Sequence, residues 1–404
     1  DMGGVPATTN NPTSFTIESP TIILTDPYIT DPSYEGCVFE GWYKDRNFTE
    51  RVTSIPTGTG NGMILYAKWT IPTFTITYNW NGGNEVTSAK KTYTVLDLPI
   101  SLPSPSKSDH EFLYWTDTDR NGDLITEITS CQDYCLYANY LINGMSFSEI
   151  SGGGILGIRY GVLYTGDATS IEIPKYYFFD CFDGPLCREI DTINSIDSCA
   201  NLETVIMPDS VTLLYHYAFM DCPKLTNVML SANLEAIDSY AFVRCPALQN
   251  LSLPESILSI SNYAFSGCDN LKFNRYGNAN YLGNEQNPYL VLFRVTDATA
   301  TTVTIPTDTK VLADYSFDTP QLTEITIPSG VTRIGKSAFR ACSNLTRVVF
   351  ENPNGWGYSN YFYMGDRIEL SSDDLSKHVL SAIYLKNGYQ KNYCNRYWAR
   401  FETA

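Results

Sequence analysis

One acidic segment carries the clearest metal-binding pattern in the chain. Its polar residues alternate in the order by which a loop wraps oxygen ligands around calcium. The predicted ligands are Asp117, Asp119, Asn121 and Asp123. The twelfth position, which needs a carboxylate, is Ile128, and Glu127 lies one residue early. A tight turn at Asn121-Gly122 between two strands explains the same residues, so both interpretations stand.

No other set of residues points to catalysis. The histidines His110, His216 and His378 lie in three separate segments without a Ser or Cys motif beside them, so no triad can be argued. Gly152-Gly153-Gly154 lacks the Lys-Ser/Thr of a phosphate loop and is typical of a flexible connection. Carboxylates are too numerous for one pair to indicate a hydrolase. We therefore expect a non-enzyme without a cofactor, calcium aside.

The charge of the chain excludes several partners. Its 404 residues carry a formal net charge of −17, which repels phosphate backbones and anionic lipids. We expect no nucleic-acid binding. No run of 18 apolar residues occurs, so no membrane insertion is predicted for this fragment, and its first residues resemble neither an export signal nor an anchor.

Much of the chain is built from a sequence repeat, and its strands and turns would position any functional site there. Cysteines recur every 23 residues, and Leu follows each of them by three. The members of this series are Cys199, Cys222, Cys245 and Cys268. A fixed period of this length indicates stacked units, each of which buries its apolar face against its neighbours.

Each unit divides into two halves. After the Leu, apolar residues alternate as in a short strand, for example Val228 and Leu230, and Pro often ends the strand, as at Pro254. The other half spaces its apolar residues by four and three, which predicts a short helix or 3₁₀ turn. Ile237, Ala241, Phe242 and Cys245 are one such set. The strands should pair into a parallel sheet. We expect an insertion at 274–300 and a cap at 371–404, in which residues 389–398 have helical spacing.

A binding surface is predicted at the strand positions that alternate with the core, because the concave face of such an array is its commonest contact site. These residues form a mostly neutral polar strip. They are Glu203, Thr204, Asn227, Gln249, Asn250, Ser252, Thr323, Glu324, Thr326, Thr346 and Arg347.

The repeated cysteines are expected to act as small buried hydrophobes, since their spacing is explained without disulfides. Two other pairs, Cys131 with Cys135 and Cys181 with Cys187, remain open as disulfides.

Two similar segments precede the repeats. The segment from Gly36 to Tyr43, followed by Leu65 to Trp69, parallels the segment from His110 to Trp115, followed by Leu136 to Tyr140. An alternating strand ending at Gly82-Gly83 opens the second segment, and the first lacks its counterpart. Each is a small β module of about 70 residues, typical of a spacer.

The repeat motif Ala-Phe-x-x-Cys-x-x-Leu resembles the BspA-like class of leucine-rich repeats, and the two modules resemble the internalin-type B-repeat, or Listeria-Bacteroides repeat. This resemblance implies a mixed α/β and β fold. A right-handed curved leucine-rich-repeat solenoid with a parallel sheet, residues 143–404, would follow two β-grasp-like modules at 1–71 and 72–142, the first truncated.

The resemblance also implies an exported bacterial surface protein, extracellular or cell-attached. It would bind host or neighbouring-cell surface or matrix proteins through its repeats. Glycan binding is the alternative, because 29 Tyr and 6 Trp offer faces for sugar rings. A hydrolase is the third.

Overall fold

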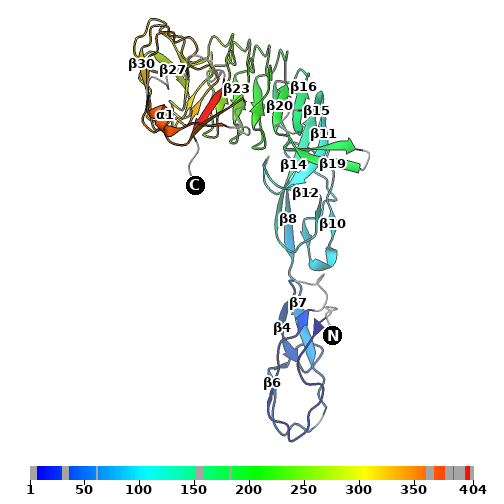
Figure 1. Cartoon of the computed structure of the whole chain (residues 1–404). Helices are drawn as coiled ribbons and strands as arrows, with labels where there is room; N and C mark the ends of the chain where they lie inside the picture. The colour runs from blue at the N-terminus through cyan, green and yellow to red at the C-terminus, as the bar shows by residue number, and fades with distance from the viewer. Residues whose placement is uncertain are drawn as a thin grey trace. The chain divides into compact units, whose positions relative to one another are not determined.

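The computed structural model describes residues 7–29, 36–60, 62–119, 121–151, 158–181, 184–360, 368–377, 385 and 396–400. The chain divides into two compact units (Figure 1). Unit 1 holds residues 1–108 and 112–140, and unit 2 holds residues 109–111 and 141–404. Strands dominate both units.

The first part of unit 1 consists of antiparallel strands. They are β1 (Ala7–Thr8), β2 (Ile22–Ile23), β3 (Tyr28–Ile29), β4 (Val38–Tyr43), β5 (Arg51–Val52), β6 (Ser54–Ile55) and β7 (Tyr66–Thr70). β4 is the centre of a three-stranded sheet between β5 and β7. The ring of Phe39 makes edge contacts with Trp42 and Trp69, at centroid distances of 5.5 and 5.4 Å.

The second part of unit 1 has a five-stranded sheet in the order β12-β11-β14-β8-β9, in which β14 and β8 run parallel. Its elements are β8 (Phe74–Asn79), β9 (Thr92–Tyr93), η2 (Val95–Asp97), β10 (Ile100–Ser101), β11 (His110–Thr116), β12 (Leu124–Ile125), β13 (Glu127–Ile128) and β14 (Tyr134–Ile142). Trp115 is buried at its core against Tyr78, Trp80 and Phe112. The Trp115 indole N–H donates to the Pro103 carbonyl at 2.7 Å, which satisfies its buried polar atom.

Unit 2 opens with the hairpin of β15 (Met145–Ser151) and β16 (Ile158–Tyr164) and continues into the repeats. On one side of the coils, the strands that follow the repeated Leu pair in parallel. These are β17 (Ser170–Glu172), β21 (Thr204–Ile206) and β23 (Asn227–Met229), and later β30 (Glu324–Ile327) and β32 (Arg347–Phe350). Val205 and Val228 on these strands are buried, as the alternation predicts.

A second parallel ladder runs along the half of each coil that was predicted to be helical. Its strands are β20 (Thr192–Ser195), β22 (Leu213–Leu214), β24 (Ala236–Ile237) and β25 (Ser259–Ile260), and later β28 (Val291–Val295), β29 (Val311–Leu312) and β31 (Arg333–Ile334). Where both ladders are present, as between the coils of β21–β22 and β23–β24, one coil is hydrogen-bonded to the next on two sides. Figure 1 draws several of these coils side by side in green.

The mixed α/β prediction was wrong for the described residues. The segment after β24 is a series of turns, because Tyr240 and Arg244 have φ of 60° and 59°, which a right-handed helix cannot accommodate. The predicted apolar face is nevertheless buried at Ala241, Phe242 and Cys245. α1 (Ser372–Ser376) is the one α-helix of which the structure describes both ends.

A continuous spine fills the coils. The ring of Phe242 stacks on Phe219 at 5.0 Å and on Phe265 at 5.6 Å. The Cys245 thiol lies 2.9 Å from the Phe219 carbonyl oxygen, and the Cys268 thiol lies 2.9 Å from that of Phe242. The repeated cysteines therefore combine burial with a hydrogen bond to the preceding coil.

The segment predicted as an insertion forms two antiparallel connections within the repeats. β26 (Asn274–Tyr276) pairs with β27 (Ala279–Leu282), which pairs with β28. β18 (Tyr176–Cys181) and β19 (Gly184–Glu189) form another hairpin.

The carboxyl-terminal aromatics were expected at helical spacing, but the described part of this segment is strand β35 (Tyr397–Arg400). It pairs with β31 and with β33 (Trp356–Ser359), which in turn pairs with β34 (Ile368–Glu369). Trp398 and Trp356 are buried there. Residues 389–395 lie outside the described part of the chain.

No disulfide joins Cys131 to Cys135. Cys131 packs instead beside the buried Cys37. In the β18–β19 hairpin, Cys181 is opposite Gly184 and Cys187 is opposite Phe178, so the second predicted pair is not a cross-strand pair. The side chain of Cys181 lies outside the described set.

Candidate functional site

The predicted strand strip lies at the surface, with Thr204 half-buried and the other members exposed. The structure brings some of them together. Thr204 pairs with Asn227 across β21 and β23, and Arg347 forms an ion pair with Glu324 across β30 and β32. Gln249, Asn250 and Ser252 lie in a coil segment between these two groups of strands, without strand assignment of their own.

The predicted calcium ligands lie in the connection between β11 and β12. The Asp117 carboxylate accepts the Asp123 backbone N–H at 2.7 Å, and the Asp117 N–H donates to the Asp123 carbonyl at 3.2 Å. Asp117 thus closes the loop. Within the described residues, no group of three or more His, Cys, Asp or Glu is arranged to hold a metal ion.

The histidines lie in separate parts of the chain. His110 begins β11, and His216 is exposed with its ring in edge contact with Tyr217 at 4.5 Å. His378 lies outside the described residues.

A row of stacked tyrosines lies along the turns of three successive coils, a surface that the sequence analysis missed. We call Tyr217, Tyr240 and Tyr263 the tyrosine ladder. Tyr240 stacks on Tyr217 at 5.3 Å and 19°, and on Tyr263 at 5.3 Å and 8°. Tyr217 and Tyr263 are 40% and 50% exposed. The signal was a Tyr directly before three of the four Ala-Phe pairs of the repeat, at the repeat period.

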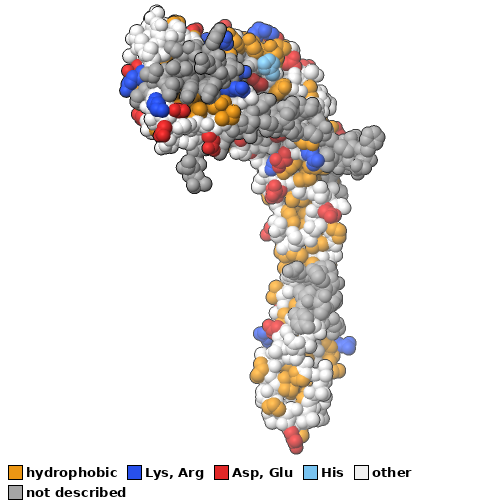
Figure 2. Space-filling view, viewed as in Figure 1, with side chains coloured by type: hydrophobic (Ala, Val, Ile, Leu, Met, Phe, Trp, Pro, Cys, Tyr) orange, Lys and Arg blue, Asp and Glu red, His pale blue; other side chains and the backbone are white. Residues whose placement is uncertain are grey.

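The surroundings of the tyrosine ladder are apolar and partly charged. Tyr215 and His216 are exposed beside it, and Arg244 forms an ion pair with Asp221 on the same turns. Figure 2 shows hydrophobic side chains gathered around a histidine on the part of the repeats that Figure 1 draws in green. This surface presents aromatic edges to solvent.

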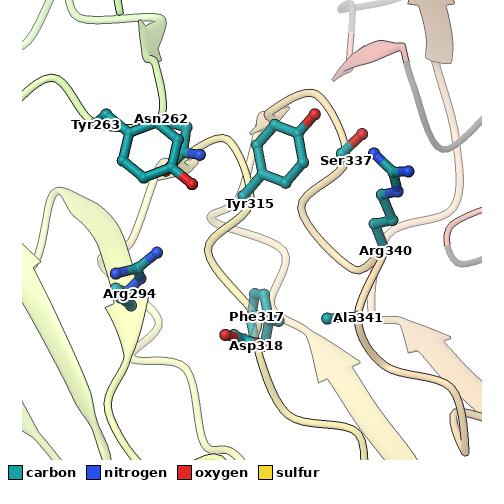
Figure 3. Close-up of a pocket in the computed structure, with 9 residues that line it drawn as sticks. All are labelled: Asn262, Tyr263, Arg294, Tyr315, Phe317, Asp318, Ser337, Arg340 and Ala341. Carbon is teal, nitrogen blue, oxygen red and sulfur yellow. The ribbon is translucent and has the colours of Figure 1, made fainter. Parts of the chain in front are cut away.

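The stacking ends at Tyr263, where a pocket of about 380 Å³ opens. The next tyrosine at the equivalent position, Tyr315, lies across this pocket (Figure 3). The pocket is lined by Asn262, Tyr263, Arg294, Tyr315, Phe317, Asp318, Ser337, Arg340 and Ala341.

The cause of the pocket is a short coil. In a regular coil, 11 residues lead from Ile237 in β24 to the buried Leu248, but only 8 lead from Leu292 in β28 to the buried Ala300. The missing residues belong to the turn that carries Tyr, Phe and Cys elsewhere. Arg294 therefore stands where a regular coil would begin that turn.

The charges at the pocket are unequal. Arg294 and Arg340 are exposed, and among the described residues neither guanidinium is paired with a carboxylate. Asp318 is an exposed carboxylate on the same lining. The pocket thus offers two cationic donors and one anionic acceptor.

An adjoining cavity of about 250 Å³ shares Asn262, Tyr263 and Arg294 and also contacts Asp314. Burial raises the pKa of the Asp314 carboxyl to about 7, although the Lys336 backbone N–H donates to it at 2.8 Å. The Tyr397 hydroxyl lies 3.4 Å from the other carboxyl oxygen, and burial raises the pKa of that phenol.

Comparison with known families agrees with this arrangement. The profile described as BspA type leucine rich repeat region matches six copies, over residues 188–285 and 293–372. The profile of the Listeria-Bacteroides repeat domain matches residues 2–68 and 74–139. The chain carries BspA-type repeats behind Listeria-Bacteroides repeat domains. The tyrosine ladder and the pocket both lie in the BspA-type repeats.

Two curated relatives come from Evansella cellulosilytica. One, named a Gly-rich membrane protein, is 34% identical over 135 residues, which is 32% of this chain and 15% of the relative. The other, named a membrane protein, is 35% identical over 133 residues, covering 31% and 19%. The chain spans less than a fifth of the length of these relatives. In the described residues, no helix has the length and apolar character needed to span a bilayer.

Solved structures similar to the chain include a leucine rich cell surface protein of Faecalibacterium prausnitzii. It is 23% identical with a TM-score of 0.32, covering 54% of this chain and 55% of that one. A leucine-rich repeat protein of Bacteroides ovatus is 17% identical with a TM-score of 0.29, covering 52% and 70%.

Proposed function

We propose that this chain is the binding part of an exported bacterial surface protein, which attaches to a protein on a host or neighbouring cell, or in its matrix, without catalysis. The observation that carries the proposal is the tyrosine ladder. Exposed Tyr side chains supply large contact area at low cost in side-chain entropy, and they are enriched among the residues that dominate binding energy.

The geometry of the tyrosine ladder favours a protein partner over a glycan. Sugars bind aromatic side chains through the ring face, but both faces of Tyr240 are covered by Tyr217 and Tyr263. The ladder therefore offers ring edges and hydroxyls, which suit the mixed polar and apolar surface of a folded protein.

The predicted strand strip is the second contact surface in this proposal. Its neutral residues would add hydrogen bonds at the rim of a partner, where they contribute specificity more than affinity.

The wider architecture belongs to the proposal as well. The repeats, residues 143–404, would form a right-handed curved solenoid. Two β-grasp-like spacer modules, residues 1–71 and 72–142, would hold it away from the envelope. Support comes from the BspA-type repeats and from the two relatives named as membrane proteins.

The test is a binding screen of residues 1–404 against purified extracellular matrix and host-surface proteins, followed by affinity measurement on each hit. The variant Tyr217→Ser with Tyr240→Ser should weaken binding by about a hundredfold or more, because two aromatic anchors are lost. The matched control is Tyr276→Ser, which removes an exposed tyrosine from β26.

Circular dichroism spectra and melting temperatures that match those of the parent chain will show that both variants are folded. Binding that survives the double variant but is lost in Asn227→Lys with Thr326→Lys would move the contact to the strand strip. No saturable binding above a charge-matched control protein would refute the proposal.

A further inference from the structure

We propose that the pocket between Tyr263 and Tyr315 binds an acidic saccharide, through a pyranose ring that carries a carboxylate. This site adjoins the proposed protein contact at Tyr263, which belongs to both, and it takes a different class of ligand. Its features are two guanidinium groups, two tyrosines and a small set of hydrogen-bonding side chains, all facing one pocket (Figure 3).

The guanidinium groups select for an anion. Arg294 and Arg340 are exposed and line the same pocket, and Figure 3 shows them on two sides of the opening. Among the described residues neither guanidinium forms an ion pair with a carboxylate, so both are available to a ligand. A guanidinium forms two parallel hydrogen bonds to a carboxylate, which gives this pair both affinity and orientation for one.

The tyrosines select for a ring. Tyr263 stacks on Tyr240 on one side only, and its other side borders the pocket. Tyr315 lies opposite. The apolar C–H face of a pyranose packs well against an aromatic side chain in this position.

The remaining polar groups suit sugar hydroxyls. Asp318 can accept hydrogen bonds from two hydroxyls, and the Asn262 side chain both donates and accepts. Ligand pockets of small molecules span about 300 to 1,000 Å³, so a volume of about 380 Å³ suits one or two sugar rings.

An acidic peptide fits the pocket less well. One general mode of peptide recognition pairs the peptide backbone with a free strand edge. Here the wall is already bonded to the next coil, because the N–H of Tyr315 donates to Lys336 and that of Phe317 to Ala338. Recognition at this wall therefore relies on side chains, as it does for a sugar.

The experiment titrates residues 1–404 with glucuronic acid, galacturonic acid and N-acetylneuraminic acid, and with glucose as the neutral control, using calorimetry and saturation-transfer NMR. At least one acid should bind saturably below about 20 mM, and glucose at least about tenfold more weakly, since a charge-assisted bidentate pair is lost. Arg294→Gln and Arg340→Gln should each weaken sugar binding by about tenfold or more. Tyr315→Ala should also weaken sugar binding, because the sugar ring loses its contact with the aromatic side chain.

Arg275→Gln is the matched control, because it removes an exposed arginine on β26 and should leave sugar binding unchanged. Glucose binding as tightly as the acids, or indifference to both pocket arginine variants, would overturn the proposal. So would the absence of binding by every acid tested, and a Glu-rich peptide that bound in their place would reassign the pocket to peptides.

The two proposals fail separately. The variant Tyr217→Ser with Tyr240→Ser should keep sugar binding, and Arg340→Gln should keep protein binding. Melting temperatures of all variants within about 3 °C of the parent chain confirm that the fold is intact.

Discussion

The thiol of Cys245 donates a hydrogen bond to the carbonyl oxygen of Phe219, 2.9 Å away and one coil earlier. The same bond joins Cys268 to Phe242. A cysteine at this position does two things at once: it fills the interior of its own coil and it satisfies a buried backbone acceptor of the preceding one.

The first prediction concerns this bond. Cys245→Ala should lower stability by about 1 to 3 kcal/mol, because the Phe219 carbonyl loses its donor and a small void replaces the sulfur. The measurement is the urea midpoint followed by circular dichroism. Cys135→Ala, at an exposed position, is the control and should change stability by less than about 0.5 kcal/mol. Equal stability of both variants would contradict the role given to the thiol.

Thiol reactivity gives a second prediction. Hydrogen bonds with the neighbouring Cys222 and Cys268 thiols, together with burial, raise the pKa of Cys245 above that of a free thiol. Iodoacetamide at pH 8 should therefore modify the exposed Cys135 within minutes and leave Cys245 intact until the protein unfolds. Peptide mass spectrometry reads out each site. Rapid native labelling of Cys245 would show that the spine opens readily.

The third prediction concerns pH. Burial raises the pKa of Asp314 to about 7 in the folded chain, against about 4 when unfolded. Between pH 4 and 7, the Asp314 carboxyl is therefore protonated in the folded chain and ionised in the unfolded chain. The free energy of unfolding should fall as pH rises from 4 to 7 and level off above pH 7. Asp314→Asn should remove this loss, which amounts to about 2 to 4 kcal/mol at pH 8.

The control for that experiment is Asp269→Asn, at an exposed site, measured in the same urea series at pH 4.5, 6 and 8. If stability depends on pH in the same way in the parent chain and in Asp314→Asn, the raised pKa of Asp314 is contradicted.

A fourth prediction separates the two interpretations of the acidic loop. Asp117→Ala should lower the melting point of unit 1 in EDTA, by an amount equivalent to about 1 kcal/mol, because the Asp123 N–H loses its acceptor. The exposed Glu127→Ala is the control. Addition of calcium should leave the parent melting point unchanged. A calcium-dependent rise that Asp117→Ala abolishes would restore the metal interpretation.

The sequence predicted which positions are buried, but it predicted the wrong secondary structure for the segment that holds them. Phe242 and Cys245 are in the core as predicted, but an offset of three or four residues is shared by a helix and by a coil of tight turns. Positive φ at Tyr240 and Arg244 is the feature that excludes a helix. Tyr and Arg do not predict a positive φ from sequence. Gly267, which is equivalent to Arg244 in the next coil, does predict it.

The candidate surfaces were harder to predict. The strand strip follows from simple alternation, and its members are at the surface. The tyrosine ladder could have been found from the Tyr that comes before three of the four Ala-Phe pairs, at the period of the repeat. The pocket arises from a change in coil length between Leu292 and Ala300, and its walls come from units that are distant in sequence.

The shortened coil also shows how such an array forms a recess. Loss of a few residues inside one turn leaves β28 and β29 in register, so the neighbouring units keep their shape and become ready-made walls. A deletion elsewhere in the array would open a different recess, lined by whichever side chains its neighbours already carry. In a stacked array of this kind, trimming a single turn is therefore enough to create a recess, without building any new element.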